Sequence, residues 1–247
     1  MPKTPAKKTP AKKTPAKKTP AKKTPAKKTP AKKTPGKKTP GEEARGRRAG
    51  ASRPHTFSRA ELEAARTRTV PDLVGPGLRL LFCGINPGLW TAASGAHFAH
   101  PGNRFYKALH AAGITRDLLD VRAGFDAASR AALVDKGIGI TNLVMRTTAR
   151  ADELDPDEFR KGAERLTRKV RRLRPRVLAF VGLGAYRTGF GRPTARVGEQ
   201  DHRIGETAIW ALPNPSGLNA HYGLEALAEL YGQVAQAAGV ALQASRR

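Results

Sequence analysis

The sequence has 247 residues and a formal net charge of +26, because 46 lysines and arginines face only 20 aspartates and glutamates. The single cysteine, Cys83, excludes an internal disulfide and a cluster held by four cysteines, and its place in an apolar run predicts a core residue. We expect neither a secretory signal nor a membrane span, because no apolar segment follows the first lysines and no apolar run is long enough to cross a bilayer.

The first 50 residues differ in composition from the rest. Residues 2–41 repeat KKTPA with a period of five, and residues 1–50 contain 15 lysines, three arginines and two glutamates. A proline in every repeat blocks long helices, and there is too little apolar surface to form a core, so we predict a disordered, extended basic arm over residues 1–50. One interpretation is a solubilising tail. The lysines favour a nucleic-acid tether, and the segment resembles the Lys/Pro/Ala-rich tails of linker-histone-like proteins.

Strands and helices are predicted to alternate along the rest of the chain. Residues 51–70 are polar and Arg-rich, which is typical of a linker, with one short helix at 58–67. Apolar runs predict buried strands at 78–85, 138–144, 176–182 and 207–213, with a loop between the first strand and Pro101. Apolar spacing and end signals predict helices at 103–113, 126–136, 155–174, 183–190 and 222–239. This alternation indicates an α/β fold, a three-layer α/β/α sandwich with a mainly parallel four-stranded sheet, over residues 71–240.

Two unusual segments follow strands of the predicted sheet. GINPG (84–88) follows the first strand, and NPSGLNAHY (214–222) follows the fourth. Ligands of parallel sheets bind at the carboxyl ends of the strands, so we expect one site built from both segments. An asparagine before proline and glycine is, by itself, more typical of a turn, so the short motif alone does not establish chemistry.

Three longer blocks carry a family resemblance: GINPGLWTAASGAHFAHPGNRFYKALHAAG, TNLVMRTTARADEL and LPNPSGLNAHY. They resemble the mismatch-specific uracil/thymine DNA glycosylases, a branch of the uracil-DNA glycosylase superfamily. The resemblance implies a base-flipping enzyme that starts base excision repair by hydrolysing the N-glycosidic bond of uracil, or of thymine or etheno-cytosine, opposite guanine. We therefore expect a cytoplasmic, nucleoid-associated monomer without a cofactor, whose partner is double-stranded DNA containing mismatched or damaged pyrimidines.

The resemblance also implies roles for residues of the pocket. Asn86 matches the family's catalytic asparagine. An amide does not titrate near neutrality, so it would orient a water by accepting its hydrogen bond rather than act as a strong base. Phe98 matches the aromatic residue that stacks on the flipped base, while Ile85 and Thr91 belong to segments that would bind the pyrimidine edge and the leaving group. Asn142 is similar to a pocket residue of the animal thymine glycosylases, with a strand-end cap as the alternative.

The segment after the fourth strand matches the family's wedge, which enters the base stack when the target base leaves it. The resemblance places Asn214, Ser216, Gly217 and Leu218 in this wedge. Unstacking costs a few kcal/mol per step and is least costly at a mismatch, which favours mispaired uracil. Some bacterial relatives carry an arginine two residues after the wedge leucine, where this sequence has Ala220, so contacts to the unpaired guanine are not predicted.

Other polar residues of the first block are less specific. His97 and His100 are candidate acids, although His100 precedes Pro101 and a structural role in the loop is favoured for it. The block requires no lysine as a Schiff-base nucleophile, so we expect a monofunctional enzyme without lyase chemistry. No metal site is expected, because the six histidines are scattered and the cysteine is single.

Two other classes of protein fit parts of the sequence. An architectural DNA-binding protein would act through the basic arm alone and would release no base. A dinucleotide-binding oxidoreductase would use FVGLGAYRTGFG (180–191), which follows a predicted strand and begins Gly-x-Gly. The complete Gly-x-Gly-x-x-Gly spacing fails, however, because position 187 is arginine.

Overall fold

A computed structural model describes residues 55–217, 219 and 221–243 of the chain. The predicted arm at 1–50 lies outside these described residues, and so do Leu218 and Ala220. The helices are α1 (Arg59–Ala64), α2 (Leu89–Ser94), α3 (Phe105–Ala111), α4 (Ala127–Val134), α5 (Pro156–Leu173), α6 (Leu183–Phe190) and α7 (Leu224–Ala237), with a short 3-10 turn at Ala151–Glu153. The strands are β1 (Leu80–Gly84), β2 (Ile138–Asn142), β3 (Val177–Val181), β4 (Gly198–Ile204) and β5 (Thr207–Leu212).

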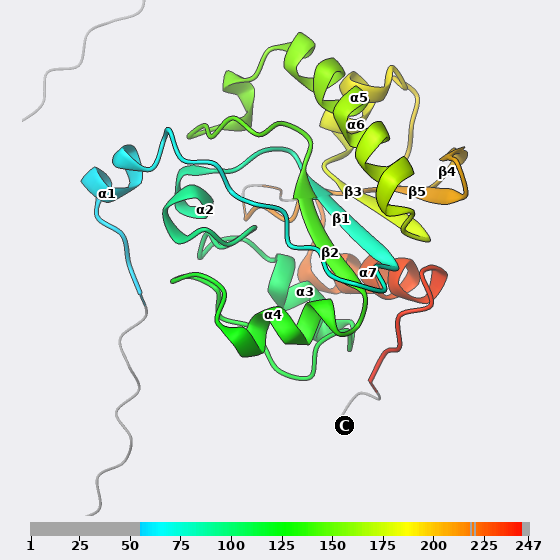
Figure 1. Cartoon of the computed structure of the whole chain (residues 1–247), viewed down its shortest axis with the longest axis horizontal. Helices are drawn as coiled ribbons and strands as arrows, with labels where there is room; N and C mark the ends of the chain where they lie inside the picture. The colour runs from blue at the N-terminus through cyan, green and yellow to red at the C-terminus, as the bar shows by residue number, and fades with distance from the viewer. Residues whose placement is uncertain (1–54, 218, 220, 244–247) are drawn as a thin grey trace, which may run out of the picture. The chain divides into compact units, whose positions relative to one another are not determined.

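The sheet has the strand order β2-β1-β3-β5-β4, in which the first four strands are parallel and β4 runs antiparallel to β5. Every residue of β1, β2 and β3 is buried, because helices cover both faces of the sheet (Figure 1). Residues of α3, α4 and α7 pack on one face, and residues of α5 and α6 pack on the other. The predicted α/β/α sandwich is thus confirmed.

The sheet has a fifth strand that the apolar pattern does not predict. The sequence of β4, GEQDHRI, is almost entirely polar, and its residues alternate between exposed and half-buried positions. This pattern is typical of an edge strand that needs only one partner, and a short turn at Gly205 (φ +60°) brings β4 beside β5. The prediction of four strands therefore found the parallel strands and missed the antiparallel edge.

The segment after β1 contains a helix where the sequence predicted only a loop. Residues 89–94 form α2, which ends at Gly95 in the left-handed conformation (φ +71°). The region predicted as a linker packs nearby: α1 begins with a Ser58–Glu61 capping box, and Ala65 and Val70 are buried against Ala92 of α2. Ordered packing therefore begins upstream of residue 71.

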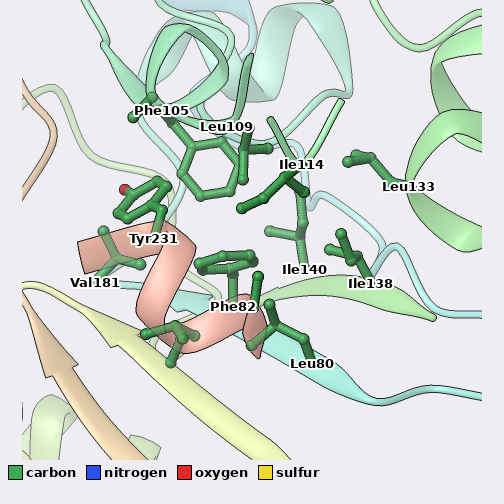
Figure 2. Close-up of a cluster of buried hydrophobic side chains, with 14 of the residues drawn as sticks. Leu80, Phe82, Phe105, Leu109, Ile114, Leu133, Ile138, Ile140, Val181 and Tyr231 are labelled. Carbon is green, nitrogen blue, oxygen red and sulfur yellow. The ribbon is translucent and has the colours of Figure 1, made fainter. Parts of the chain in front are cut away.

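An aromatic cluster fills the space between the sheet and α3 and α7 (Figure 2). Phe82 of β1 meets Phe105 of α3 edge to face with 5.1 Å between ring centroids, and Tyr231 of α7 packs against both rings. All three side chains are fully buried. Because α3 starts at Phe105, this cluster fixes the position of the α3 N-terminus relative to the end of β1. Cys83, predicted as a core residue, is buried on the opposite face.

Within the described ranges, no helix combines the length and the apolar character needed to cross a membrane.

Candidate functional site

A pocket of about 160 Å³ opens at the carboxyl ends of β1 and β2. This is well above the volume that one or two waters need, and it lies where parallel sheets bind ligands. Six residues predicted for the site line the pocket together: Ile85, Asn86, Thr91, Phe98, Asn142 and Asn214. They come from four separate parts of the chain, which the parallel strand order brings to one edge of the sheet.

Three acceptors, which share the two hydrogens of Nδ2, fix the orientation of the Asn86 amide. Its Nδ2 donates to the carbonyl oxygens of Arg146 at 3.0 Å and Pro87 at 3.2 Å, and to Oγ1 of Thr148 at 2.7 Å. The Thr148 hydroxyl donates its own hydrogen to the Arg150 carbonyl at 2.7 Å, so it must accept from Asn86. Since all three partners act as acceptors, the nitrogen has to face them, and Oδ1 is left as an acceptor that no other described residue uses.

An ion pair supports the loop that holds Asn86. The guanidinium of Arg146 binds both carboxylate oxygens of Glu158, at 2.8 and 2.7 Å, and also donates to the Glu153 carbonyl. This pairing lowers the pKa of Glu158 to about 2. The Arg146 carbonyl that accepts from Asn86 is therefore anchored to the first turn of α5. Sequence reasoning identified neither Arg146 nor Thr148, because both lie about 60 residues from Asn86.

The backbone of Phe98 has a strained conformation, and its ring is held in place by stacking. Phe98 has φ +56°, which is uncommon for a residue with a bulky side chain. Its ring stacks on that of Phe105, with 4.1 Å between centroids and 17° between planes. Because Phe105 is fixed in the core, Phe98 forms a rigid wall of the pocket.

The orientation of Asn142 is set by a buried histidine. His97 is 1% exposed, and its Nε2 lies 3.0 Å from the Pro71 carbonyl, which can only accept, so Nε2 carries the proton. Burial lowers the pKa of His97, and the neutral ring therefore presents an unprotonated Nδ1 to Nδ2 of Asn142 at 3.2 Å. Asn142 must consequently point Oδ1, a hydrogen-bond acceptor, away from His97. His97, a candidate acid from the sequence, is thus buried and contacts Asn142.

Gly84 is a further residue of the site that the sequence analysis did not single out. A Cβ atom at this position would lie 2.6 Å from Oδ1 of Asn142 and 3.1 Å from Cζ of Phe98. A side chain here would therefore force the Asn142 acceptor to shift, whereas glycine lets this acceptor and the aromatic wall lie against the end of β1. In the sequence, the sign of its importance is a glycine near the end of an apolar run that predicts a buried strand.

Thr91 and His100 both line the pocket, whereas Ser216 and Gly217 are not among its lining residues. Thr91 is buried at the first turn of α2, and His100 is exposed, with Nδ1 accepting from the Gly102 amide at 3.0 Å. Ser216 and Gly217 belong to the segment between β5 and α7, which we call the wedge loop, described at residues 213–217, 219 and 221–223. A Cβ on Gly217 would meet the Gly102 carbonyl at 2.8 Å, so this loop approaches the one before α3 closely. The predicted wedge residue Leu218 is not among the described residues.

The described part of the chain contains no group of three or more histidine, cysteine, aspartate or glutamate side chains placed to hold a metal ion. The glycine-rich start of α6 is not a complete dinucleotide fingerprint, because Arg187 stands in place of the third glycine. Its guanidinium donates to the Ala195 carbonyl at 2.9 and 2.6 Å.

The chain was also compared with known protein families. A family model described as the uracil DNA glycosylase superfamily matches residues 71–234, about two thirds of the chain. The chain belongs to this superfamily. Membership of the uracil DNA glycosylase superfamily implies a DNA glycosylase, a hydrolase that acts on DNA. A solution NMR structure of a candidate uracil DNA glycosylase from Methanosarcina acetivorans is also similar, with 16% identity and a TM-score of 0.44 over 69% of this chain and 97% of that one.

Proposed function

We propose that the chain is a monofunctional, mismatch-specific DNA glycosylase that excises uracil opposite guanine, with thymine and etheno-cytosine as further substrates to test. The orientation of Asn86 carries this proposal. Its nitrogen is occupied by three acceptors, so only Oδ1 can act toward the pocket. An acceptor in this place can hold a water by one of its hydrogens and direct the water oxygen to the sugar carbon of the scissile bond.

The amide cannot take a proton as a strong base would, so it cannot convert the water into hydroxide. The N-glycosidic bond must therefore break before the water, a weak nucleophile, attacks. The sugar then develops oxocarbenium character, the base leaves as an anion, and the water adds to the sugar carbon and releases its proton to solvent. Thr91 and Ile85 line the same pocket, and in this mechanism they would contact the departing base.

The pocket also supports selection of uracil over cytosine. Uracil and thymine carry an N–H at ring position 3, whereas neutral cytosine carries a bare nitrogen there. The Oδ1 atom of Asn142, oriented by His97, can accept from that N–H, and with cytosine it would face another acceptor. A site built to accept a hydrogen bond disfavours a ligand that cannot donate it. The face of Phe98 turned away from Phe105 is available to stack on the flipped base.

The absence of lyase chemistry is part of the proposal. Lyase activity of a glycosylase requires an amine that forms a Schiff base with the sugar. Among the described residues that line the pocket there is no lysine. Borohydride treatment during the reaction is therefore expected to trap no covalent complex with DNA.

The test uses duplexes that each contain one lesion opposite guanine, with alkali cleavage to reveal abasic sites. We expect cleavage at uracil in the wild type and none at a normal G·C pair. An architectural protein acting through the basic arm would bind all duplexes and create no abasic site, which would refute the proposed activity. Equal excision of uracil opposite guanine and opposite adenine would retain the glycosylase and refute mismatch specificity.

A further inference from the structure

Arg104 makes four hydrogen bonds to main-chain carbonyls of the wedge loop. This half-buried side chain lies at the start of α3. Its Nη1 donates to Tyr222 at 2.7 Å, its Nη2 to Ser216 and Asn219 at 2.8 Å each, and its Nε to Pro215 at 3.4 Å. None of the ion pairs among the described residues includes Arg104, so these carbonyls are its partners in place of a carboxylate.

The guanidinium suits this arrangement because it is planar and has five N–H groups in a fixed geometry. Four of the five are used on the loop, which leaves little capacity for a DNA phosphate unless the loop is released. Among the described residues of the loop, the Asn219 amide donates to the Ser216 carbonyl at 2.9 Å, and the Asn214 and Asn219 side chains bond to neighbouring main-chain groups. Arg104 is the side chain that joins four carbonyls of this loop, and it adds to these local bonds.

The same segment connects the wedge loop to the aromatic wall of the pocket. The backbone amide of Arg104 donates to the Pro215 carbonyl at 3.0 Å, and Asn103 pairs with Ser216 in an isolated antiparallel β-bridge. The next residue, Phe105, carries the ring on which Phe98 stacks. Two consecutive residues thus hold the loop that would replace a flipped base and the ring that would receive it.

We propose that Arg104 is a positioning residue for base flipping, which shapes the wedge loop before DNA is bound. This inference rests on the proposed function. A preformed loop avoids the cost of ordering its backbone when it enters the duplex. Single-stranded DNA needs no replacement for the flipped base, so Arg104 should matter for duplex substrates and little for single strands. A structural role confined to general stability would affect both substrates alike.

The experiment compares the wild type with Arg104→Gln and Arg104→Lys. Single-turnover excision of uracil is measured in a G·U duplex and in a single strand of the same sequence. We expect the duplex-to-single-strand rate ratio to fall at least roughly tenfold in Arg104→Gln, equivalent to about 1.4 kcal/mol. Arg104→Lys should fall in between, because an ammonium group has three donors at one point and cannot span four carbonyls. Lys107→Gln is the matched control: it removes one charge from an exposed position of the same helix and should leave the ratio unchanged.

Hydrogen–deuterium exchange of the free proteins gives a readout that does not require activity. Amides of residues 216–222 should exchange faster in both Arg104 variants than in the wild type and Lys107→Gln, while amides of β1 stay protected. Equal losses on the two substrates, or unchanged exchange in the loop, would overturn the role of Arg104. If the wild type releases no base from either substrate, the proposed function fails and the flipping role falls with it. Exchange then still decides whether Arg104 shapes the loop.

Discussion

Nδ1 of His97 lies 3.2 Å from the amide nitrogen of Asn142, and this contact decides which end of the amide faces the pocket. The Pro71 carbonyl fixes the proton on Nε2 of His97, so the histidine can only accept from Asn142 as long as it is neutral. In the proposed mechanism, recognition of the substrate is therefore linked to the protonation of a group that does not itself line the pocket.

Excision of uracil should therefore decrease in acid. Burial places the pKa of His97 below its ordinary value of 6.5. Once Nδ1 is protonated, it opposes the Asn142 nitrogen, and the amide must turn and present a donor to the pocket. We expect the single-turnover rate to fall at a pH below 6.5, and this acid limb to disappear in His97→Gln. His100→Gln, which alters an exposed histidine, should keep the decrease of the rate in acid. If this decrease disappeared in His100→Gln and persisted in His97→Gln, His97 would not be the group responsible.

The free energy of unfolding should also depend on the protonation of His97, in a direction that follows from its pKa. The folded pKa of His97 is lower than the unfolded value of 6.5, so the unfolded chain binds the proton more readily. The contribution of neutral His97 is fully present above pH 6.5 and is lost progressively as the pH falls from 6.5 toward the folded pKa. Urea unfolding across this interval should give a steeper loss for the wild type than for His97→Gln. Parallel curves would show that His97 titrates alike in both states.

Asn86→Ala should abolish excision while DNA binding persists. The substitution removes the acceptor that orients the water and leaves the surface of the pocket largely intact. Misplacing a reactant by about 1 Å can cost about 10²-fold in rate, so we expect at least roughly a hundredfold loss in single-turnover excision. Binding to a G·U duplex, followed by fluorescence anisotropy, should change only slightly. Full activity would remove Asn86 from the mechanism.

Gly84→Ala should impair excision through the shape of the pocket. The new methyl group would lie 2.6 Å from Oδ1 of Asn142 and would displace either this acceptor or the Phe98 ring. Overpacking of this kind costs about 1–3 kcal/mol, which corresponds to a loss of roughly 5- to 150-fold if it falls on the bound substrate. Gly184→Ala is the control, because a Cβ there meets no atom within 4 Å and α6 should tolerate it. Comparable excision by the two variants would contradict the constraint at Gly84.

Removal of residues 1–50 should weaken binding to undamaged duplex DNA at low salt and leave the chemical step unchanged. Each phosphate that the protein neutralises adds about 0.9 to the slope of log affinity against log salt. If about five lysines of the arm engage at once, the slope should decrease by roughly four to five units. A salt titration of both forms measures this change. An unchanged slope would show that the arm binds something other than DNA, and a collapse of single-turnover excision would show that it contributes to the site.

The sequence alone determined the parallel sheet and the region of the site. β1, β2, β3 and β5 lie in mainly apolar segments, because strands covered on both faces need little polar surface, and such segments are visible locally. The edge strand β4 and the short helix α2 were missed for the opposite reason: each gains its stability from neighbours rather than from its own pattern. Asn86 and Phe98 were located from a contiguous block of residues.

Only the tertiary structure decided how these residues are oriented. The contact between Asn142 and His97 joins residues 45 positions apart, and Arg104 reaches the wedge loop across more than 110 positions. The direction of an amide and the partners of a guanidinium depend on which donors and acceptors surround them after folding. Gly84 shows the same limit, since its importance comes from two side chains that approach it from other parts of the chain. Local periodicity reports which residues are buried, whereas long-range packing determines which polar atoms meet.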